Sequence, residues 1–224
     1  MAAKVLVIAA HPDDEVLGVG GTVARHVDAG DEVTLLVAVA GGLLHDRDGS
    51  GRARREARAA AAELGVADLR LLDLPDQRLD TLCLVDIVTP LEEAVASLRP
   101  EIVYLQWGGD INKDHKLLFE AALVALRPME RSIREILAFD TVSSTEWGYP
   151  RNFVPDTWID VSAQVERKMA ALACYASEMR AFPHPRSAES IRAKMTATGA
   201  QACLPAAEAF MTIRRVMRND QAPG

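Results

Sequence analysis

The sequence predicts an α/β fold in which a doubly wound, mostly parallel β-sheet is flanked by helices and followed by a C-terminal helical cap. Strand-like apolar runs alternate with helical patterns through the first two-thirds of the chain, which is typical of a parallel sheet covered on both faces. The apolar runs are nearly continuous, without the alternation that one solvent-exposed face would produce. A chain of 224 residues, 49% of them hydrophobic, can form one compact domain with an ample core.

Five core strands are expected, and Val, Ile and Leu dominate them, as in strands buried on both faces. They are residues 4–10, 32–39, 69–74, 101–107 and 134–141. This alternation favours a Rossmann-like sheet with strand order 3-2-1-4-5, in which the first and fourth strands are neighbours.

Four helices are expected to connect these strands, because apolar residues recur there at helical spacing. They are Val16–Ala29, Arg52–Leu64, Leu79–Leu98 and Lys116–Leu126. The second of them is rich in Ala, Arg and Glu, which are strong helix formers.

The remaining segments are expected to form pocket loops and a cap on the same core. The loops are Gly41–Gly51 and Val142–Asp156, followed by a helix over Ser162–Arg180, a turn over Phe182–Arg186, a helix from Ser187 to about Thr198, and an apolar piece over Phe210–Val216. We therefore expect a single domain over residues 1–224, with a core over 1–141 and pocket and cap elements over 142–224.

Composition narrows the classes of partner. The formal net charge of −7 gives no general reason to bind nucleic acid or an anionic membrane, and no apolar run reaches the roughly 20 residues that span a bilayer. Cys83, Cys174 and Cys203 are widely spaced and show no metal-binding pattern, which fits a reducing cytoplasm. We expect a cytoplasmic protein with a small-molecule substrate, and homo-oligomerisation stays open.

The first candidate site directly follows the first strand, at His11-Pro12-Asp13-Asp14-Glu15. Burying several carboxylates costs several kcal/mol or more unless a basic partner or a cation neutralises them. No Lys or Arg follows before Arg25. A metal ion is therefore the simplest explanation, and one nitrogen with several oxygen ligands suits a divalent ion such as zinc.

A second group of ligand candidates, Asp110 to His115, follows the strand that ends at Trp107. In the expected strand order, the two loops face each other at the carboxyl ends of neighbouring strands. His11, Asp14 and His115 then become three protein ligands of an open catalytic site, which leaves one position for water.

The neighbouring carboxylates receive separate roles. Asp13 cannot easily bind the same ion as Asp14, so we assign it as the general base that takes a proton from the activated water. Glu15 is expected to hydrogen-bond backbone amides or a ligand at the start of the following helix. Asp114 is a candidate acceptor for a site imidazole.

These residues resemble the LmbE/PIG-L family of metal-dependent de-N-acetylases, whose signature is similar to Ala10–Glu15. Further segments resemble those of bacterial members, so the likeness covers nearly the whole chain. They are Asn112–His115, Ser143–Gly148, Phe182–Ser187 and Ala207–Phe210.

The resemblance implies zinc-dependent hydrolysis of an N-acyl group, commonly an acetyl group on an amino sugar. It implies His11, Asp14 and His115 as metal ligands and Asp13 as the base. Another divalent ion in place of zinc stays open.

One position departs from the family pattern, because many members carry a histidine where Asn112 stands. Asn112 can donate a hydrogen bond to an oxyanion but cannot act as an acid. The proton for the leaving amine then falls to protonated Asp13 or to another group, for which His184 is the candidate. Arg52 and Arg54 are candidates for binding substrate hydroxyls or a phosphate.

Other functions remain as alternatives. The substrate could be a non-sugar N-acyl amide, or the protein could be a non-catalytic binding protein with the same fold. A nucleotide-binding oxidoreductase or transferase is disfavoured, because the first turn lacks Gly-x-Gly-x-x-Gly and presents carboxylates where a pyrophosphate needs amides.

Overall fold

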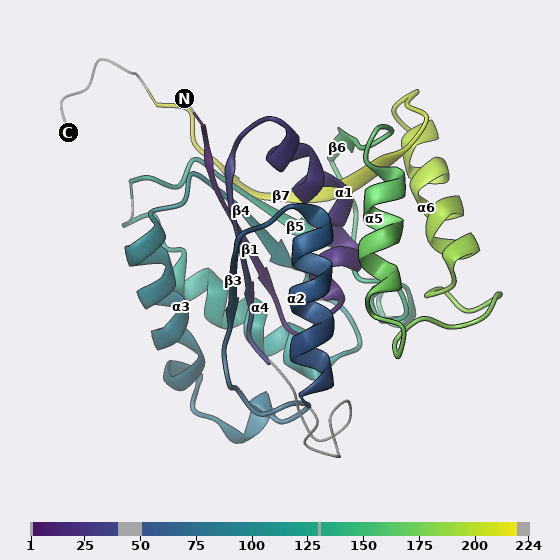
Figure 1. The fold of residues 1–224 in the computed structure, drawn as a ribbon. Helices are drawn as coiled ribbons and strands as arrows, with labels where there is room; N and C mark the ends of the chain where they lie inside the picture. Colours follow the sequence, from purple (N-terminus) through teal and green to yellow (C-terminus); the bar gives the residue numbers. More distant parts are fainter. Residues whose placement is uncertain (1, 40–50, 130, 219–224) are drawn as a thin grey trace.

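The computed structural model describes residues 2–39, 51–129 and 131–218, and within them seven strands form one sheet of order β3-β2-β1-β4-β5-β7-β6. The first five strands pair in parallel. The predicted fold class and the predicted order 3-2-1-4-5 are therefore confirmed. Figure 1 shows the twisted sheet between two layers of helices.

The described elements follow the expected alternation. The strands are β1 (Lys4–Ala9), β2 (Glu32–Val37), β3 (Asp68–Leu71), β4 (Ile102–Gln106), β5 (Glu135–Phe139), β6 (Thr157–Asp160) and β7 (Ala207–Arg215). The α-helices are α1 (Asp14–Asp28), α2 (Arg52–Leu64), α3 (Leu84–Leu98), α4 (Lys113–Ala125), α5 (Val165–Ala173) and α6 (Ala188–Ala200), with 3-10 turns η1 (Leu79–Thr81) and η2 (Thr145–Trp147).

The sheet is buried on both faces, which explains its continuously apolar strands. In β1, Val5 and Val7 pack into one core with α1, α2, α5 and α6, whereas Leu6 and Ile8 pack into a second core with α3 and α4. Figure 1 shows these two helix layers on opposite sides of the sheet. Because side chains alternate between faces, every position in the middle of β1 must be apolar.

The C-terminal third differs from the expected helical cap, because it also extends the sheet. β7 pairs antiparallel with β5, and β6 pairs antiparallel with β7. An antiparallel edge on an otherwise parallel sheet is common in doubly wound folds. The predicted loop Gly41–Gly51 lies outside the described residues except for Gly51.

The larger differences between the expected and observed helix boundaries have local reasons. The helix expected over Ser162–Arg180 is α5, which ends at Ala173, where the chain turns Tyr175 inward. The helix expected from Leu79 is split into η1 and α3 by extended backbone at Leu82 and Cys83. α4 begins three residues before the expected start because Asn112 caps it.

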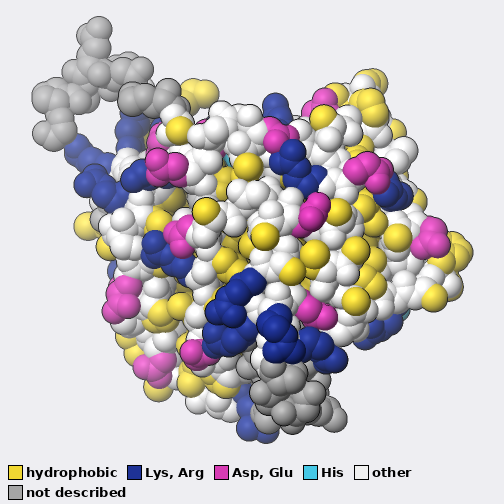
Figure 2. Space-filling view, viewed as in Figure 1, with side chains coloured by type: hydrophobic (Ala, Val, Ile, Leu, Met, Phe, Trp, Pro, Cys, Tyr) yellow, Lys and Arg dark blue, Asp and Glu magenta, His cyan; other side chains and the backbone are white. Residues whose placement is uncertain are grey.

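Figure 2 shows Lys and Arg side chains gathered over the lower end of α2, in the view of Figure 1. The first seven residues of α2 include Arg52, Arg54, Arg55 and Arg58. Among the described residues, the helices are all too short or too polar to cross a lipid bilayer.

Helix α1 packs closely at two glycines, one against the last residue of β5 and the other against the residue that follows β6. A Cβ atom at Gly18 would lie 2.1 Å from Cδ2 of Phe139, and one at Gly21 would lie 2.9 Å from Cβ of Val161. These contacts leave no room for a larger residue. The position of α1, which begins at the candidate site, therefore depends on glycine.

We predict that Gly18→Ala destabilises the protein, because overpacking a dense core costs about 1–3 kcal/mol. Helix propensity alone predicts the opposite sign, since Ala stabilises a helix by about 1 kcal/mol relative to Gly. Urea denaturation measures the difference. A variant as stable as the native chain contradicts the close packing described here.

Candidate metal centre and active site

The two predicted ligand loops meet at the carboxyl ends of β1 and β4. These strands are parallel neighbours, with Ile8 opposite Leu105. The loop after β1 carries His11 and leads into α1 at Asp14, and the loop after β4 leads into α4, whose first turn carries His115. The structure thus brings His11, Asp14 and His115 together.

Three ligand atoms from these residues form a nearly equilateral triangle. Nδ1 of His11 lies 3.2 Å from Oδ2 of Asp14 and 3.2 Å from Nε2 of His115, and Nε2 of His115 lies 3.3 Å from Oδ2 of Asp14. A tetrahedral zinc ion with bonds of about 2.0–2.1 Å needs neighbouring ligand atoms about 3.3–3.4 Å apart. All three side chains are buried. The donor set and its spacing therefore fit a tetrahedral divalent ion.

Each histidine has a carboxylate beside its remote ring nitrogen. Nδ1 of His115 lies 2.6 Å from Oδ2 of Asp110, and Nε2 of His11 lies 3.3 Å from Oδ2 of Asp114. A proton on the remote nitrogen donates to the carboxylate and leaves the lone pair of the facing nitrogen for a cation. Asp114 thus contacts His11 rather than its sequence neighbour, and Asp76 lies on the same side of His11, 3.6 Å from Nε2.

Asp110 lies in the second group of ligand candidates, but its contact with His115 could not be predicted from the sequence. It precedes His115 by five residues, and one oxygen contacts that imidazole while the other accepts from the backbone N–H of Asn112. No spacing rule marks such a contact. The only signal was its place in the same polar loop after β4.

Asp13 lies beside the three ligand atoms but has a different partner. Its Oδ2 accepts a 2.6 Å hydrogen bond from Nη1 of Arg186, which also contacts Glu178 and, through Nε, the hydroxyl of Ser143. The backbone of Asp13 has φ of 108°, a conformation that non-glycine residues rarely adopt and that tends to occur at functional sites. Arg186 is thus a second candidate that the sequence did not single out.

Glu15 supports this arrangement from beneath. Its Oε2 accepts from the backbone N–H of Asp13, and its Oε1 accepts a 2.5 Å hydrogen bond from the hydroxyl of Tyr175. Burial raises the pKa of Glu15 to about 7. Glu15 therefore contacts the backbone of the loop and is itself held by Tyr175, two residues after the end of α5.

The two adjacent aspartates have opposite pKa shifts. Burial acts to raise the pKa of Asp14, but His115 and His11 outweigh it and hold that pKa well below its usual range. Burial raises the pKa of Asp13 well above its usual range, and Arg186 opposes this only in part. Asp14 is thus a carboxylate suited to bind a cation, whereas Asp13 suits a group that takes and returns a proton.

Asn112 lines the cleft and caps α4. Its Oδ1 accepts from the backbone N–H of Asp114 at 2.9 Å, so its NH₂ group is the part not committed to the cap. The described residues that line the cleft come from both ligand loops and from three other segments. They are His11, Pro12, Asp13, Asp14, Gln77, Asn112, His115, Ser143, Ser144 and Arg186.

The other three candidate residues lie outside this described lining. Nδ1 of His184 accepts from the backbone N–H of Arg186, and its ring packs edge-on 6.0 Å from Trp147. Arg54 pairs with Asp73, and Arg52 is the first residue of α2. Their predicted roles in proton delivery and substrate binding stay predictions.

Comparison with known proteins agrees with this geometry. The profile of the PIG-L family, described as GlcNAc-PI de-N-acetylase, matches residues 6–126. A 1D-myo-inositol 2-acetamido-2-deoxy-alpha-D-glucopyranoside deacetylase from Kineococcus radiotolerans is 27% identical, over 79% of this chain and 69% of its own. A diacetylchitobiose deacetylase from Thermococcus kodakarensis is 30% identical, over 78% of this chain and 70% of its own.

A solved structure of GalB, the 4-carboxy-2-hydroxymuconate hydratase from Pseudomonas putida KT2440, has the same fold. It has a TM-score of 0.78 and 22% sequence identity, and the alignment covers 98% of this chain and all of that chain. At this identity the likeness concerns the fold alone.

We predict that Asp110→Asn weakens divalent-metal affinity by about 10–100-fold, the usual effect of losing a carboxylate behind a histidine ligand. Competition with a metal-chelating dye measures the affinity. Asp28→Asn removes an exposed carboxylate at the far end of α1 and should leave it unchanged. Equal affinities for both variants and the native chain contradict the role of Asp110.

Proposed function

The chain belongs to the PIG-L family, and from this premise we propose that it is a metal-dependent N-deacetylase that hydrolyses the acetamide of an amino sugar or of a sugar-containing metabolite. The observation that carries the proposal is the triangle of ligand atoms from His11, Asp14 and His115, with the carboxyl group of Asp13 beside it. The two curated relatives, both deacetylases of acetamido sugars by name, support the substrate class.

His11, Asp14 and His115 would hold the ion, and we propose zinc, because two imidazoles and one carboxylate form a known catalytic zinc ligand set. A divalent ion at this position supplies a Lewis acid for the amide carbonyl and lowers the pKa of water. Asp110 and Asp114 hold the two imidazoles in the tautomers that binding requires.

Asp13 would act first as base and then as acid. Its carboxylate takes a proton from the attacking water, and the new C–O bond gives a tetrahedral carbon. The NH₂ group of Asn112 can donate a hydrogen bond to the developing oxyanion. Asp13 then returns its proton to the amine nitrogen as the C–N bond breaks, and acetate and a free amine leave.

Arg186 would act as a positioning residue for Asp13 while that carboxyl group loses and regains its proton. Its guanidinium fixes the carboxyl group through the 2.6 Å contact and balances its charge when the proton is absent. Because Arg186 is itself anchored by Glu178 and by Ser143, the base is held from the C-terminal third of the chain. His184, the other candidate for the acid, contacts the backbone of Arg186 instead.

The proposed setting is a reducing cytoplasm and a small N-acetylated substrate. The three cysteines are free, which agrees with this setting. The hydratase of the same fold shows why fold alone does not identify the reaction.

To test this proposal, the metal content of the purified protein is determined first. The protein is then incubated with N-acetylglucosamine, N,N′-diacetylchitobiose and N-acetylglucosaminyl inositol. Mass spectrometry detects the free amine and acetate. We expect release from at least one of these sugars and much less from N-acetylated amines without a sugar. Metal-loaded protein that releases acetate from none of them, or from the non-sugar amides alone, contradicts the proposal.

We predict that Asp13→Asn and His115→Ala separate metal binding from proton transfer. Asp13→Asn should retain metal at the native content but lose about 10²–10⁴-fold in kcat, because the base is absent. His115→Ala should lose both metal and activity. Elemental analysis and kinetics on the same samples measure the two effects, and equal metal loss in both variants would rule out the separate role of Asp13.

A further inference from the structure

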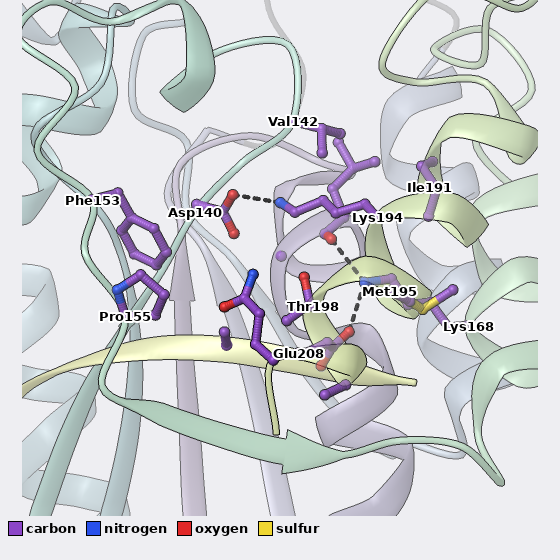
Figure 3. A pocket seen from close by; sticks show the side chains of 15 residues that line it. Asp140, Val142, Phe153, Pro155, Lys168, Ile191, Lys194, Met195, Thr198 and Glu208 are labelled. Atoms are coloured by element: carbon purple, nitrogen blue, oxygen red, sulfur yellow. Dashed lines mark hydrogen bonds and ion pairs between the residues drawn. The ribbon is translucent and has the colours of Figure 1, made fainter. Parts of the chain in front are cut away.

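A second cavity of about 140 Å³ lies between helix α6 and the antiparallel edge of the sheet (Figure 3). Its walls come from α1, α5 and α6, from the segments that follow β5 and precede β6, and from β7. Cavities of roughly 150 Å³ hold a molecule the size of benzene. Among the residues that the structure describes, those that line this cavity and those that line the catalytic cleft are different.

The floor of this cavity holds a buried ion pair that is already satisfied by the protein. Nζ of Lys168 lies 2.6 Å from Oε1 of Glu208 and donates to the carbonyl oxygen of Leu17. Glu208 also accepts hydrogen bonds from the backbone N–H groups of Gly21 and Thr22. A ligand would have to break several of these bonds to replace either charge. The pair therefore limits the space available to a ligand but does not bind its charged groups.

A second ion pair, between Asp140 and Lys194, lies higher on the wall and is more accessible (Figure 3). Their side chains are 23% and 36% exposed, against 3% for Lys168. The described lining residues therefore carry two positive and two negative charges, which sum to zero. A ligand with one charge would unbalance these charges, whereas a ligand with both charges can lie along this accessible pair, with its ammonium next to Asp140 and its carboxylate next to Lys194, and leave the pair itself intact.

Apart from the two ion pairs, the lining is mixed. Val142, Phe153, Ile191 and Met195 supply apolar side chains (Figure 3), whereas Thr198 adds a hydroxyl group and Gln201 an amide. Binding sites with an apolar lining and a few placed polar groups favour ligands of the same mixed character. We propose that this cavity is a second small-molecule site, for a compact zwitterion that carries an ammonium and a carboxylate group on an apolar body, as an α-amino acid with an aliphatic side chain does.

Adjacent residues of one segment line the cavity and the catalytic cleft. Val142 lines the cavity, and its neighbour Ser143 lines the cleft and accepts from Nε of Arg186. α6, which contributes Ile191 and Lys194 to the cavity, begins two residues after Arg186. An occupant would therefore touch the two segments that position Arg186.

Isothermal titration of the full-length, metal-loaded protein with L-leucine tests the proposal. Two analogues separate the charges: 4-methylpentanoate lacks the ammonium group, and isopentylamine lacks the carboxylate. We expect saturable binding of leucine and at least about tenfold weaker binding of each analogue, because each loses one charge-assisted contact. Absence of leucine binding, or equal binding of an analogue, overturns the proposal.

Variants locate the binding. Lys194→Met and Asp140→Asn should each weaken leucine binding about tenfold or more. Arg192→Met, which removes the cation of an exposed ion pair on the same helix, should not change it. Thermal melting confirms that each variant folds, and Asp140→Asn, which is nearly isosteric, keeps the test informative if Lys194→Met does not.

Amino acids also chelate metal ions, so one variant is needed to show that leucine does not simply bind the metal of the catalytic site. Leucine binding should persist in His115→Ala, which lacks a metal ligand but keeps the cavity. Binding that is lost in His115→Ala and kept in Lys194→Met assigns the ligand to the metal and overturns the proposal.

Discussion

The adjacency of β1 and β4 is the constraint on which the candidate site depends. Neighbouring strands lie about 4.8 Å apart, and their loops can bring Nδ1 of His11 within 3.2 Å of Nε2 of His115. One further strand between them would add a similar spacing and separate the ligand atoms beyond common coordination. Because β1 and β4 are parallel, both ligand loops also leave the sheet at the same edge. The topology therefore makes the site possible before any side chain is considered.

The charge balance of the buried ligand group then favours a cation. Asp14, Asp110 and Asp114 surround His11 and His115, and all five are buried. With both imidazoles neutral, as metal binding requires, these three carboxylates leave three negative charges, and a divalent ion leaves one; Asp76, 3.6 Å from Nε2 of His11, adds to the same excess. Protonation of both histidines in place of the ion also leaves one negative charge. The added protons would then sit on the two nitrogens that face each other 3.2 Å apart, and two positively charged rings would be in contact. One dication satisfies the same carboxylates without that repulsion.

The sequence predicted the parallel core, and it also predicted that His11, Asp14 and His115 lie together, because both features produce local patterns. Continuous apolar runs identify doubly buried strands, and polar residues directly after them identify the edge of the sheet where ligands bind. Asp110 and Arg186 were not assigned, because their roles depend on contacts across the fold: Arg186 meets Asp13 from 173 residues away. β6 and β7 were missed for a related reason. β7 carries the buried Glu208, a charge that breaks a strand pattern and is explained only by Lys168 and by the backbone of α1.

That buried pair bears on the site through α1. A buried ion pair contributes little net stability, because desolvation offsets its attraction. Lys168 and Glu208 nevertheless bind the carbonyl of Leu17 and the N–H of Gly21, which are one turn apart in α1. Contacts with both backbone polarities of the same turn restrict rotation of the helix about its axis and sliding along it. Since Asp14 is the first residue of α1, a rotation or shift of this helix would move its Oδ2 away from the two histidine nitrogens that now lie 3.2 and 3.3 Å from it. Lys168 and Glu208 thus fix the position of α1, and with it that of Asp14. An apolar pair of equal volume could not do this, because apolar side chains cannot hydrogen-bond to the backbone.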